Sequence, residues 1–141
     1  MLPEVVIDTN VFIAGLRSRR GASFRLLELV GTGLFCPVLS KTLCYEYEDA
    51  GTRALSAGGM TQSDIRDVID FLGAMGRIQK VYYRLRPALP DPGDEAVLEL
   101  AFAAGSIPIV TFNTKDYRGS SVYGVRTLTP AEFLAELGVL A

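Results

Sequence analysis

The chain has 141 residues and a formal net charge of −2, and 49% of its residues are hydrophobic while 21% are charged. This size and balance fit one globular domain, residues 1–141, and exclude a disordered chain. The lack of histidine excludes an imidazole base, a Ser-His triad and a His-ligated metal, and the small net charge gives no general affinity for nucleic acid.

Strand and helix signals alternate in the first half of the chain. We expect strands at residues 5–7 and 34–38, because both are short apolar runs. A helix capped by Ser23 follows the first strand, and a helix capped by Ser40 follows the second. Residues 51–59 are rich in glycine and small side chains and are expected to form a loop.

The clearest amphipathic helix begins after Thr61, which has the spacing of a capping box with Asp64. Its apolar side chains recur at helical spacing, at Ile65, Val68, Ile69 and Leu72. We expect this face to pack in the core, and a homodimer interface is the alternative use for it.

The second half continues the alternation. Strands are expected at residues 78–82, 107–111 and 125–128. A proline-rich loop precedes a helix that begins at Asp94 and Glu95, residues 112–121 form a loop, and Thr129 caps a last helix. This regular alternation predicts a three-layer α/β/α fold with a central parallel sheet of four to five strands.

The sequence carries no signal for a membrane or for export. No apolar run approaches the roughly 20 residues of a transmembrane helix, and no basic segment precedes the first strand. We therefore expect a cytoplasmic protein. Cys36 and Cys44 lack CxxC spacing and are expected to be free thiols.

Acidic and amide side chains follow the predicted strands in separate β/α units. Asp8 comes directly after the first strand, Glu46 lies on the helix after the second, and Asp94 opens the helix after the third. Asn113 and Asp116 follow the fourth strand. Because functional crevices in such folds lie beyond the carboxyl ends of the strands, these side chains are candidates for one pocket.

Each of these residues also has a purely structural explanation. Asp8 or Asn10 would cap a first helical turn after the strand, and Asp94 is a good helix N-cap. Glu46 would be an exposed helix residue, and Asp116 a turn residue. The joint pattern, and not any single residue, carries the functional hypothesis.

Convergence of these acids would require a cation. Two carboxylates about 4 Å apart repel by roughly 4 kcal/mol at an effective dielectric near 20, so several would not gather without a metal or shared protons. Oxygen ligands without His or Cys favour Mg²⁺ or Mn²⁺, in one or two copies. Such a pocket stabilises attack of water on a phosphodiester, which is nuclease chemistry that needs no histidine.

Four segments of the chain together resemble a PIN domain: IDTNVFI, LSKTLCYEYED, DPGDEAVLELAFAAGS and IVTFNTKDY. Their order and spacing are similar to those of the VapC-like ribonucleases of bacterial and archaeal toxin-antitoxin systems. The resemblance covers nearly the whole chain and implies Mg²⁺- or Mn²⁺-dependent cleavage of single-stranded or structured RNA. It also implies an antitoxin as protein partner and a homodimer as a common assembly.

The resemblance also implies roles for individual residues. Asp8, Glu46 and Asp94 match the family's metal-binding acids, with Glu48 as the alternative to Glu46 and Asp91 as a helper of Asp94. Asn10 and Thr111 resemble groups that orient Asp8 and the metal-bound water.

One position departs from the family pattern, because Asn113 stands where an aspartate is common. An amide carries no charge, so Asp116 is expected to take over as catalytic and metal-binding acid, or only one ion binds. The same departure motivates an alternative function, a catalytically attenuated PIN fold that binds RNA or protein. A third class of function is phosphotransfer through an aspartate nucleophile. The sequence does not support it, because Asn10 stands where a second acid is expected and no lysine follows the last strand.

Five basic residues are candidates for RNA binding, because we expect them in loops beside Asp8 and Asp116: Arg17, Arg19, Arg20, Lys115 and Arg118. Solvated loop charge is the alternative explanation for each cluster.

Overall fold

The computed structural model describes residues 2–82, 84–85, 89 and 92–139. Five strands form one sheet in the order β3-β2-β1-β4-β5, and every neighbouring pair is parallel. The strands are β1 (Glu4–Ile7), β2 (Cys36–Leu39), β3 (Arg77–Ile78), β4 (Ile109–Val110) and β5 (Thr127–Leu128). The predicted parallel sheet is confirmed, with the larger of the two expected strand numbers.

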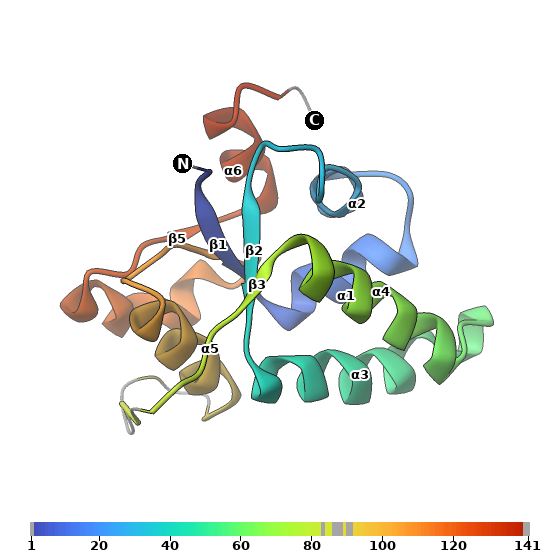
Figure 1. Cartoon of the computed structure of the whole chain (residues 1–141), viewed down its shortest axis with the longest axis horizontal. Coiled ribbons are helices and arrows are strands. Elements are labelled where there is room, and N and C mark those ends of the chain that lie inside the picture. Colours follow the sequence, from blue (N-terminus) through green and yellow to red (C-terminus); the bar gives the residue numbers. More distant parts are fainter. Residues whose placement is uncertain (1, 83, 86–88, 90–91, 140–141) are drawn as a thin grey trace.

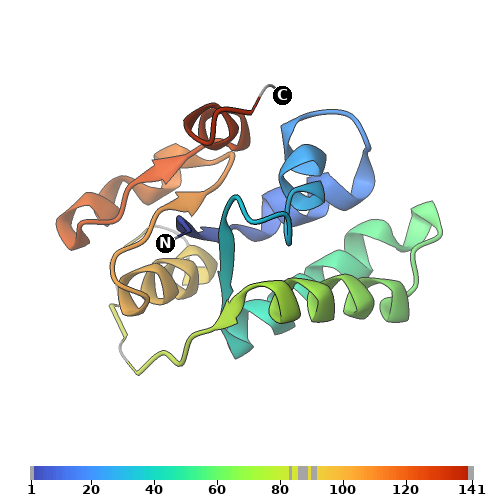
Figure 2. The ribbon, with the colours of Figure 1, turned by 45° about the horizontal axis from the view of Figure 1, so that its top comes forward.

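Helices cover both faces of the sheet. They are α1 (Thr9–Arg17), α2 (Ala22–Glu28), α3 (Lys41–Leu55), α4 (Gln62–Met75), α5 (Pro92–Ala103) and α6 (Pro130–Glu136), with 3₁₀ turns at η1 (Ser56–Gly58) and η2 (Thr114–Tyr123). Figures 1 and 2 show α5 on one side of the sheet and α1, α3 and α4 on the other, while α6 packs beside α2. Connections between parallel strands are right-handed. The chain crosses the sheet in one direction from β1 through β2 to β3 and then returns past β1 to β4, so α5, which follows β3, covers the face opposite to α1, α3 and α4.

Three of the predicted helix caps, Ser40, Thr61 and Thr129, are present. Ser40 Oγ accepts a backbone hydrogen bond of 3.1 Å in the first turn of α3. Thr61 with Asp64, and Thr129 with Glu132, form reciprocal capping boxes at the starts of α4 and α6. These local signals fix where three helices begin.

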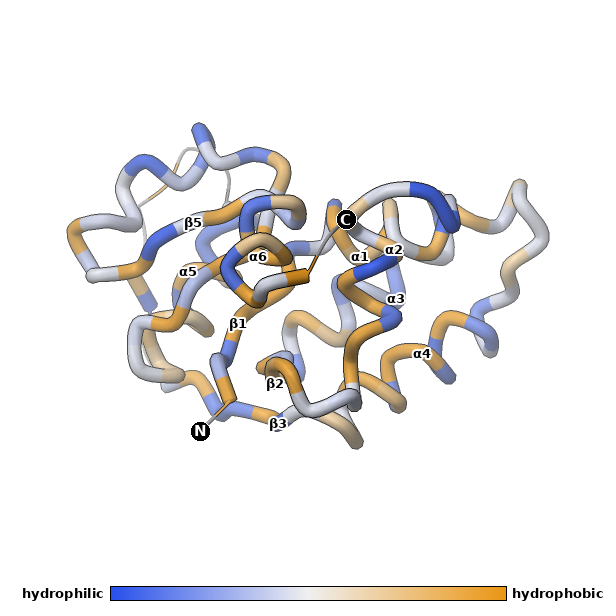
Figure 3. Tube along the Cα trace, turned by 90° about the horizontal axis from the view of Figure 1, so that it is seen from above, coloured by the Kyte–Doolittle hydropathy of each residue, from blue (hydrophilic) through white to orange (hydrophobic). Residues whose placement is uncertain are grey.

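The core lies between the sheet and its helices. Figure 3 shows hydrophobic colour along β1 and β2 and alternating colours along α4. Ile65, Ile69 and Leu72 on the apolar face of α4 are buried, so this face belongs to the core as predicted. In the described part of the chain, no helix has the length and apolar character needed to cross a membrane.

Two segments predicted as loops are helical. Residues 51–55 continue α3 and lead into η1, and residues 114–123 form η2. A helix also follows β1 directly, where the sequence predicts only a capped turn, because the apolar residues after Asp8 pack on both neighbouring helices. Strong tertiary packing outweighs the weak local preference of these stretches.

Element boundaries differ at two predicted caps. Gly21, with φ of 99°, stands at the start of α2, whereas Ser23 lies inside that helix with a buried hydroxyl that has no hydrogen-bond partner among the described residues. Helix α5 begins at Pro92, so Asp94 lies in its first turn and is not its cap. Proline is well suited to a first helical position because its missing N–H is not needed there.

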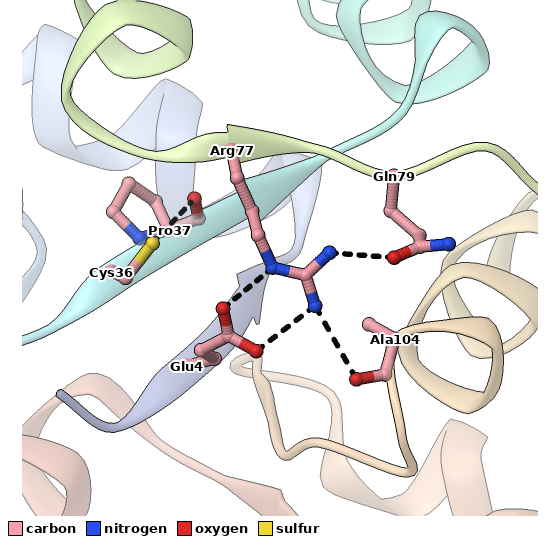
Figure 4. A network of polar contacts seen from close by, with 6 residues as sticks. All are labelled: Glu4, Cys36, Pro37, Arg77, Gln79 and Ala104. Carbon is pink, nitrogen blue, oxygen red and sulfur yellow. Dashed lines mark hydrogen bonds and ion pairs between the residues drawn. The ribbon is translucent and has the colours of Figure 1, made fainter. Parts of the chain in front are cut away.

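An ion pair joins β1 and β3 across β2, at the end of the sheet where β1 begins (Figure 4). Arg77 Nε and Nη2 lie 2.6 Å and 2.9 Å from the two carboxylate oxygens of Glu4. The same guanidinium donates to Gln79 Oε1 at 2.6 Å and to the Ala104 carbonyl at 3.4 Å. The hydrogen bonds from Arg77 lower the pKa of Glu4 below its ordinary value of 4.5.

We predict that Glu4→Gln lowers the free energy of unfolding by at most about 1 kcal/mol at neutral pH, because the pair is partly exposed. A carboxyl whose pKa is lowered by folding stabilises the protein above its unfolded-state pKa and loses that effect as pH falls. The difference in the free energy of unfolding between wild type and Glu4→Gln should therefore vanish as the pH falls below about 4.5. Urea unfolding at several pH values measures this difference.

The control is Glu28→Gln, which removes an exposed pair with Arg25 inside α2. It should change the free energy of unfolding by no more than about 0.5 kcal/mol. A gap for Glu4→Gln that stays constant down to acidic pH would contradict the prediction.

Candidate active site

The candidate site lies where the strand order reverses. Strands β1 and β4 are neighbours in the sheet, but the chain moves away from β1 in opposite directions through β2 and through β4. Ligands of open parallel sheets bind outside the carboxyl ends of the strands at such a point. Asp8 follows β1 and Thr111 follows β4, and the Asp8 N–H donates to the Val110 carbonyl at 2.9 Å.

Asp8 is a buried carboxylate with several hydrogen-bond donors. Its side chain is 5% exposed, and Oδ1 accepts from the Thr9 N–H at 2.8 Å, which caps α1. Oδ2 accepts from Thr111 Oγ1 at 2.8 Å and from the Tyr117 hydroxyl at 3.1 Å. These contacts offset the cost of burying a charge and hold the carboxylate in one orientation.

Tyr117 connects two acids from different β/α units. Its side chain is 1% exposed, and its hydroxyl oxygen lies 3.1 Å from Asp8 Oδ2 and 3.2 Å from Asp94 Oδ1. Burial first, and then the charges of Asp8 and Asp94, raise the pKa of this hydroxyl well above its ordinary value of 10.0. The phenol therefore keeps its hydrogen, and two carboxylates share one donor.

Glu46 reaches the same region from α3. Its Oε1 accepts from Thr9 Oγ1 at 3.1 Å, one residue after Asp8. The neighbouring Tyr47 anchors this part of α3, because its buried ring stacks on Phe12 at 4.2 Å and its hydroxyl donates to the carbonyl of Ile7. The helix thus presents Glu46 toward the end of β1.

Glu48 points elsewhere. It pairs with Arg66 and accepts from Gln62 Nε2 at 2.9 Å, both on α4. Side chains two positions apart on a helix point in directions about 200° apart around its axis, so only one of the two glutamates faces the site. The structure places Glu46 there.

Thr111 contacts Asp8 directly, and Asn10 contacts Thr111. The fully buried Thr111 hydroxyl donates to Asp8 and accepts from the Asn113 N–H at 3.0 Å. Asn10 Nδ2 lies 3.5 Å from the same hydroxyl, and Asn10 Oδ1 lies 3.5 Å from the Phe112 N–H. These contacts suit the predicted orienting roles of Asn10 and Thr111, whereas Asn113 contributes its backbone and exposes its side chain.

Asp116 is not part of this network. It is exposed on η2, and its side chain makes no hydrogen bond within the described residues, while the next residue, Tyr117, points inward. The helper residue predicted at Asp91 lies outside the described residues. Among the residues that the structure describes, no three acidic or cysteine side chains stand close enough to hold a metal ion.

The basic candidates fall into two groups. Arg17 lies in the last turn of α1, roughly 14 Å along the helix axis from Asp8, and donates to the Ala54 carbonyl at 3.2 Å. Arg19 and Arg20 follow the end of α1. The predicted position of these three residues in a loop beside Asp8 is therefore wrong, because the helix formed by residues 9–17 separates them from Asp8. Lys115 and Arg118 are exposed on η2, near Tyr117.

The sequence matches one family model, described as a PIN domain, over residues 4–115. The chain belongs to the PIN-domain family. This confirms the resemblance inferred from the four sequence segments, and the matched range includes Asp8, Glu46, Asp94 and Thr111 but ends before Tyr117. Among curated proteins, none matches the sequence significantly.

Solved structures share the fold at low sequence identity. VapBC2 from Rickettsia felis, bound to a DNA fragment from its promoter, matches with a TM-score of 0.61 and 12% identity over 89% of this chain and 98% of that one. VapBC-1 from nontypeable Haemophilus influenzae matches with a TM-score of 0.61 and 12% identity over 91% of this chain and 98% of that one. At this identity the similarity concerns the PIN fold alone.

Tyr117 and Thr9 are site contacts that the sequence does not reveal. Tyr117 lies in a polar stretch that is predicted to be a loop, and its distance from Asp8 in the sequence gives no indication that the two side chains are in contact. An aromatic residue in a polar segment close to a predicted acid is the one available signal.

We predict that Tyr117→Phe lowers the free energy of unfolding by about 1–3 kcal/mol, because a hydrogen bond to buried carboxylates is lost. Urea unfolding in the presence of a chelator measures this without metal. The control is Tyr123→Phe in the same segment, whose hydroxyl makes no hydrogen bond within the described residues and whose ring packs on Phe102. Equal stability of Tyr117→Phe and wild type would contradict the prediction.

Proposed function

We propose that this PIN-domain protein is a metal-dependent endoribonuclease, the toxin of a toxin-antitoxin pair. The observation that carries the proposal is the meeting of Asp8 and Asp94 on the hydroxyl of Tyr117, at the point where the sheet changes direction. Two buried or partly buried acids gathered there are poorly explained by stability alone, because like charges in a shared site repel.

The donor chemistry fits Mg²⁺ or Mn²⁺. The candidate ligands Asp8, Asp94 and Glu46 offer carboxylate oxygens, and the whole chain contains no histidine. Hard divalent ions prefer such oxygens. When bound, the ion would supply charge stabilisation at a phosphodiester and acidify the attacking water. Asp116 and the amide of Asn113 remain the candidates for a second ion.

The protein's own residues would orient and hold these acids. Thr111 and Tyr117 donate to one oxygen of Asp8 and the Thr9 N–H donates to the other, so the carboxylate cannot rotate freely. The Thr9 hydroxyl holds Glu46 at the same edge. Preorganised ligands of this kind avoid the cost of reorganisation when substrate binds.

RNA as substrate and an antitoxin as partner complete the proposal. Lys115 and Arg118 are exposed on the element that carries Tyr117 and would bind phosphates near the acids, whereas Arg17, Arg19 and Arg20 would meet only a longer RNA. The VapBC structures support a protein partner, because they share this fold. Such a partner would act by covering the acids with basic side chains.

A second function is favoured by one observation. Asp116, the acid expected to compensate for Asn113, is exposed and outside the network around Asp8. A PIN fold with weakened metal binding would serve as an RNA- or protein-binding module. Cleavage assays with and without metal distinguish the two functions.

We predict that the purified protein cleaves RNA with Mn²⁺ and that a chelator abolishes cleavage. Asp8→Asn should lower the rate by at least about 100-fold, because even outer partners of metal ligands cost 10- to 100-fold. Asparagine is a good helix N-cap, so α1 should remain folded. Cleavage that persists in Asp8→Asn or in chelator would remove the metal-carboxylate mechanism.

A second pair of variants tests the assignment on α3. Glu46→Gln should lower the cleavage rate by about tenfold or more, because the carboxylate beside Thr9 loses its charge. Glu48→Gln is the matched control and should keep the wild-type rate, since this glutamate faces Arg66. The reverse result would move the catalytic role to Glu48.

A further inference from the structure

Phe112 is an exposed aromatic residue at the edge of the candidate site. Its exposed fraction is 48%, although burying such a side chain would stabilise the protein. Phe71 on α4 is exposed to a similar degree, 46%, so exposure alone does not indicate function. The position of Phe112, directly after Thr111, distinguishes the two.

The backbone around Phe112 is fixed by the residues that hold Asp8. Its N–H lies 3.5 Å from Asn10 Oδ1, and the next N–H, of Asn113, donates to Thr111 Oγ1 at 3.0 Å. The Thr111 N–H donates to the Leu128 carbonyl at 2.8 Å, which ties this point to β5. Adjacent Cα atoms are about 3.8 Å apart, so the ring starts within a few ångströms of the residue that contacts Asp8.

Basic residues follow Phe112 in the chain. Lys115 and Arg118 follow on η2 and are exposed, and Asp116 is the only acid between residues 112 and 118. An exposed aromatic ring beside cations is the combination with which proteins bind unpaired nucleotides, because every base can stack on a ring while cations contact the phosphates. Bases inside a duplex are already stacked and cannot use such a ring.

We infer that Phe112 stacks on a nucleobase of single-stranded RNA beside the phosphate to be cleaved, with Lys115 and Arg118 on adjacent phosphates. The inference rests on the proposed nuclease function and adds to it a residue that contacts a base of the substrate. It also assigns a role to Phe112 in the TFN segment, whose Thr111 donates to Asp8 and whose Asn113 N–H donates to Thr111.

Binding is measured in the Asp8→Asn protein, so that the probe stays intact. The probes are a fluorescent single-stranded RNA of about 12 nucleotides and the same strand paired with its complement. Phe112→Ala should weaken binding of the single strand by about tenfold, because the stacking of one base on the ring is lost. Phe112→Tyr should restore it, and Phe71→Ala should bind as tightly as the parent.

Duplex binding provides the second readout. Phe112→Ala should leave it unchanged, and a parallel cleavage assay of Phe112→Ala with Asp8 intact should show a larger rise in KM than fall in kcat. Equal binding of the single strand by Phe112→Ala and the parent would overturn the inference, as would an equal loss for duplex. A change of oligomeric state in Phe112→Ala by light scattering would also overturn it, since the ring would then serve a protein interface.

The outcomes separate this inference from the proposed function. If the wild-type protein cleaves RNA while Phe112→Ala binds normally, only the stacking role fails. If the protein does not cleave RNA but Phe112→Ala loses single-strand binding, the stacking role stands and the nuclease proposal fails. If the parent binds no RNA, both are overturned.

Discussion

The candidate site depends on one contact, the phenol oxygen of Tyr117 between Asp8 and Asp94. It joins the end of β1 to the first turn of α5 through a segment that follows β4. Without a donor between them, two carboxylates so close would repel. The contact therefore explains both how the acids are brought together in the protein and why η2, a run of 3₁₀ turns without much apolar character, folds back onto the sheet.

Local signals predicted much of the fold. Ser40, Thr61 and Thr129 mark helix starts because their side chains bond to nearby backbone, and the apolar face of α4 follows a simple period. Two of the incorrect predictions have the same cause. Helix α1 and the end of α3 lack strong local preference and are helical because they pack against each other, which a short window of sequence does not contain.

The candidate site was predictable only in part for a related reason. Asp8, Glu46 and Asp94 could be proposed because each follows a strand, and parallel strands end at one edge of the sheet. The sequence does not determine which of two nearby side chains points into the site. Glu46 and Glu48 differ by half a helical rotation, and Asp116 and Tyr117 by one residue on η2, so the inward residue in each pair follows from packing, such as the stacking of Tyr47 on Phe12.

The hydrogen bond between Tyr117 and Asp8 joins residues 109 positions apart in the chain. Asp8 and Tyr117 can therefore meet only after the chain between them has been synthesised, and closing so long a loop costs entropy and slows folding. Nascent or prematurely terminated chains would lack the assembled site.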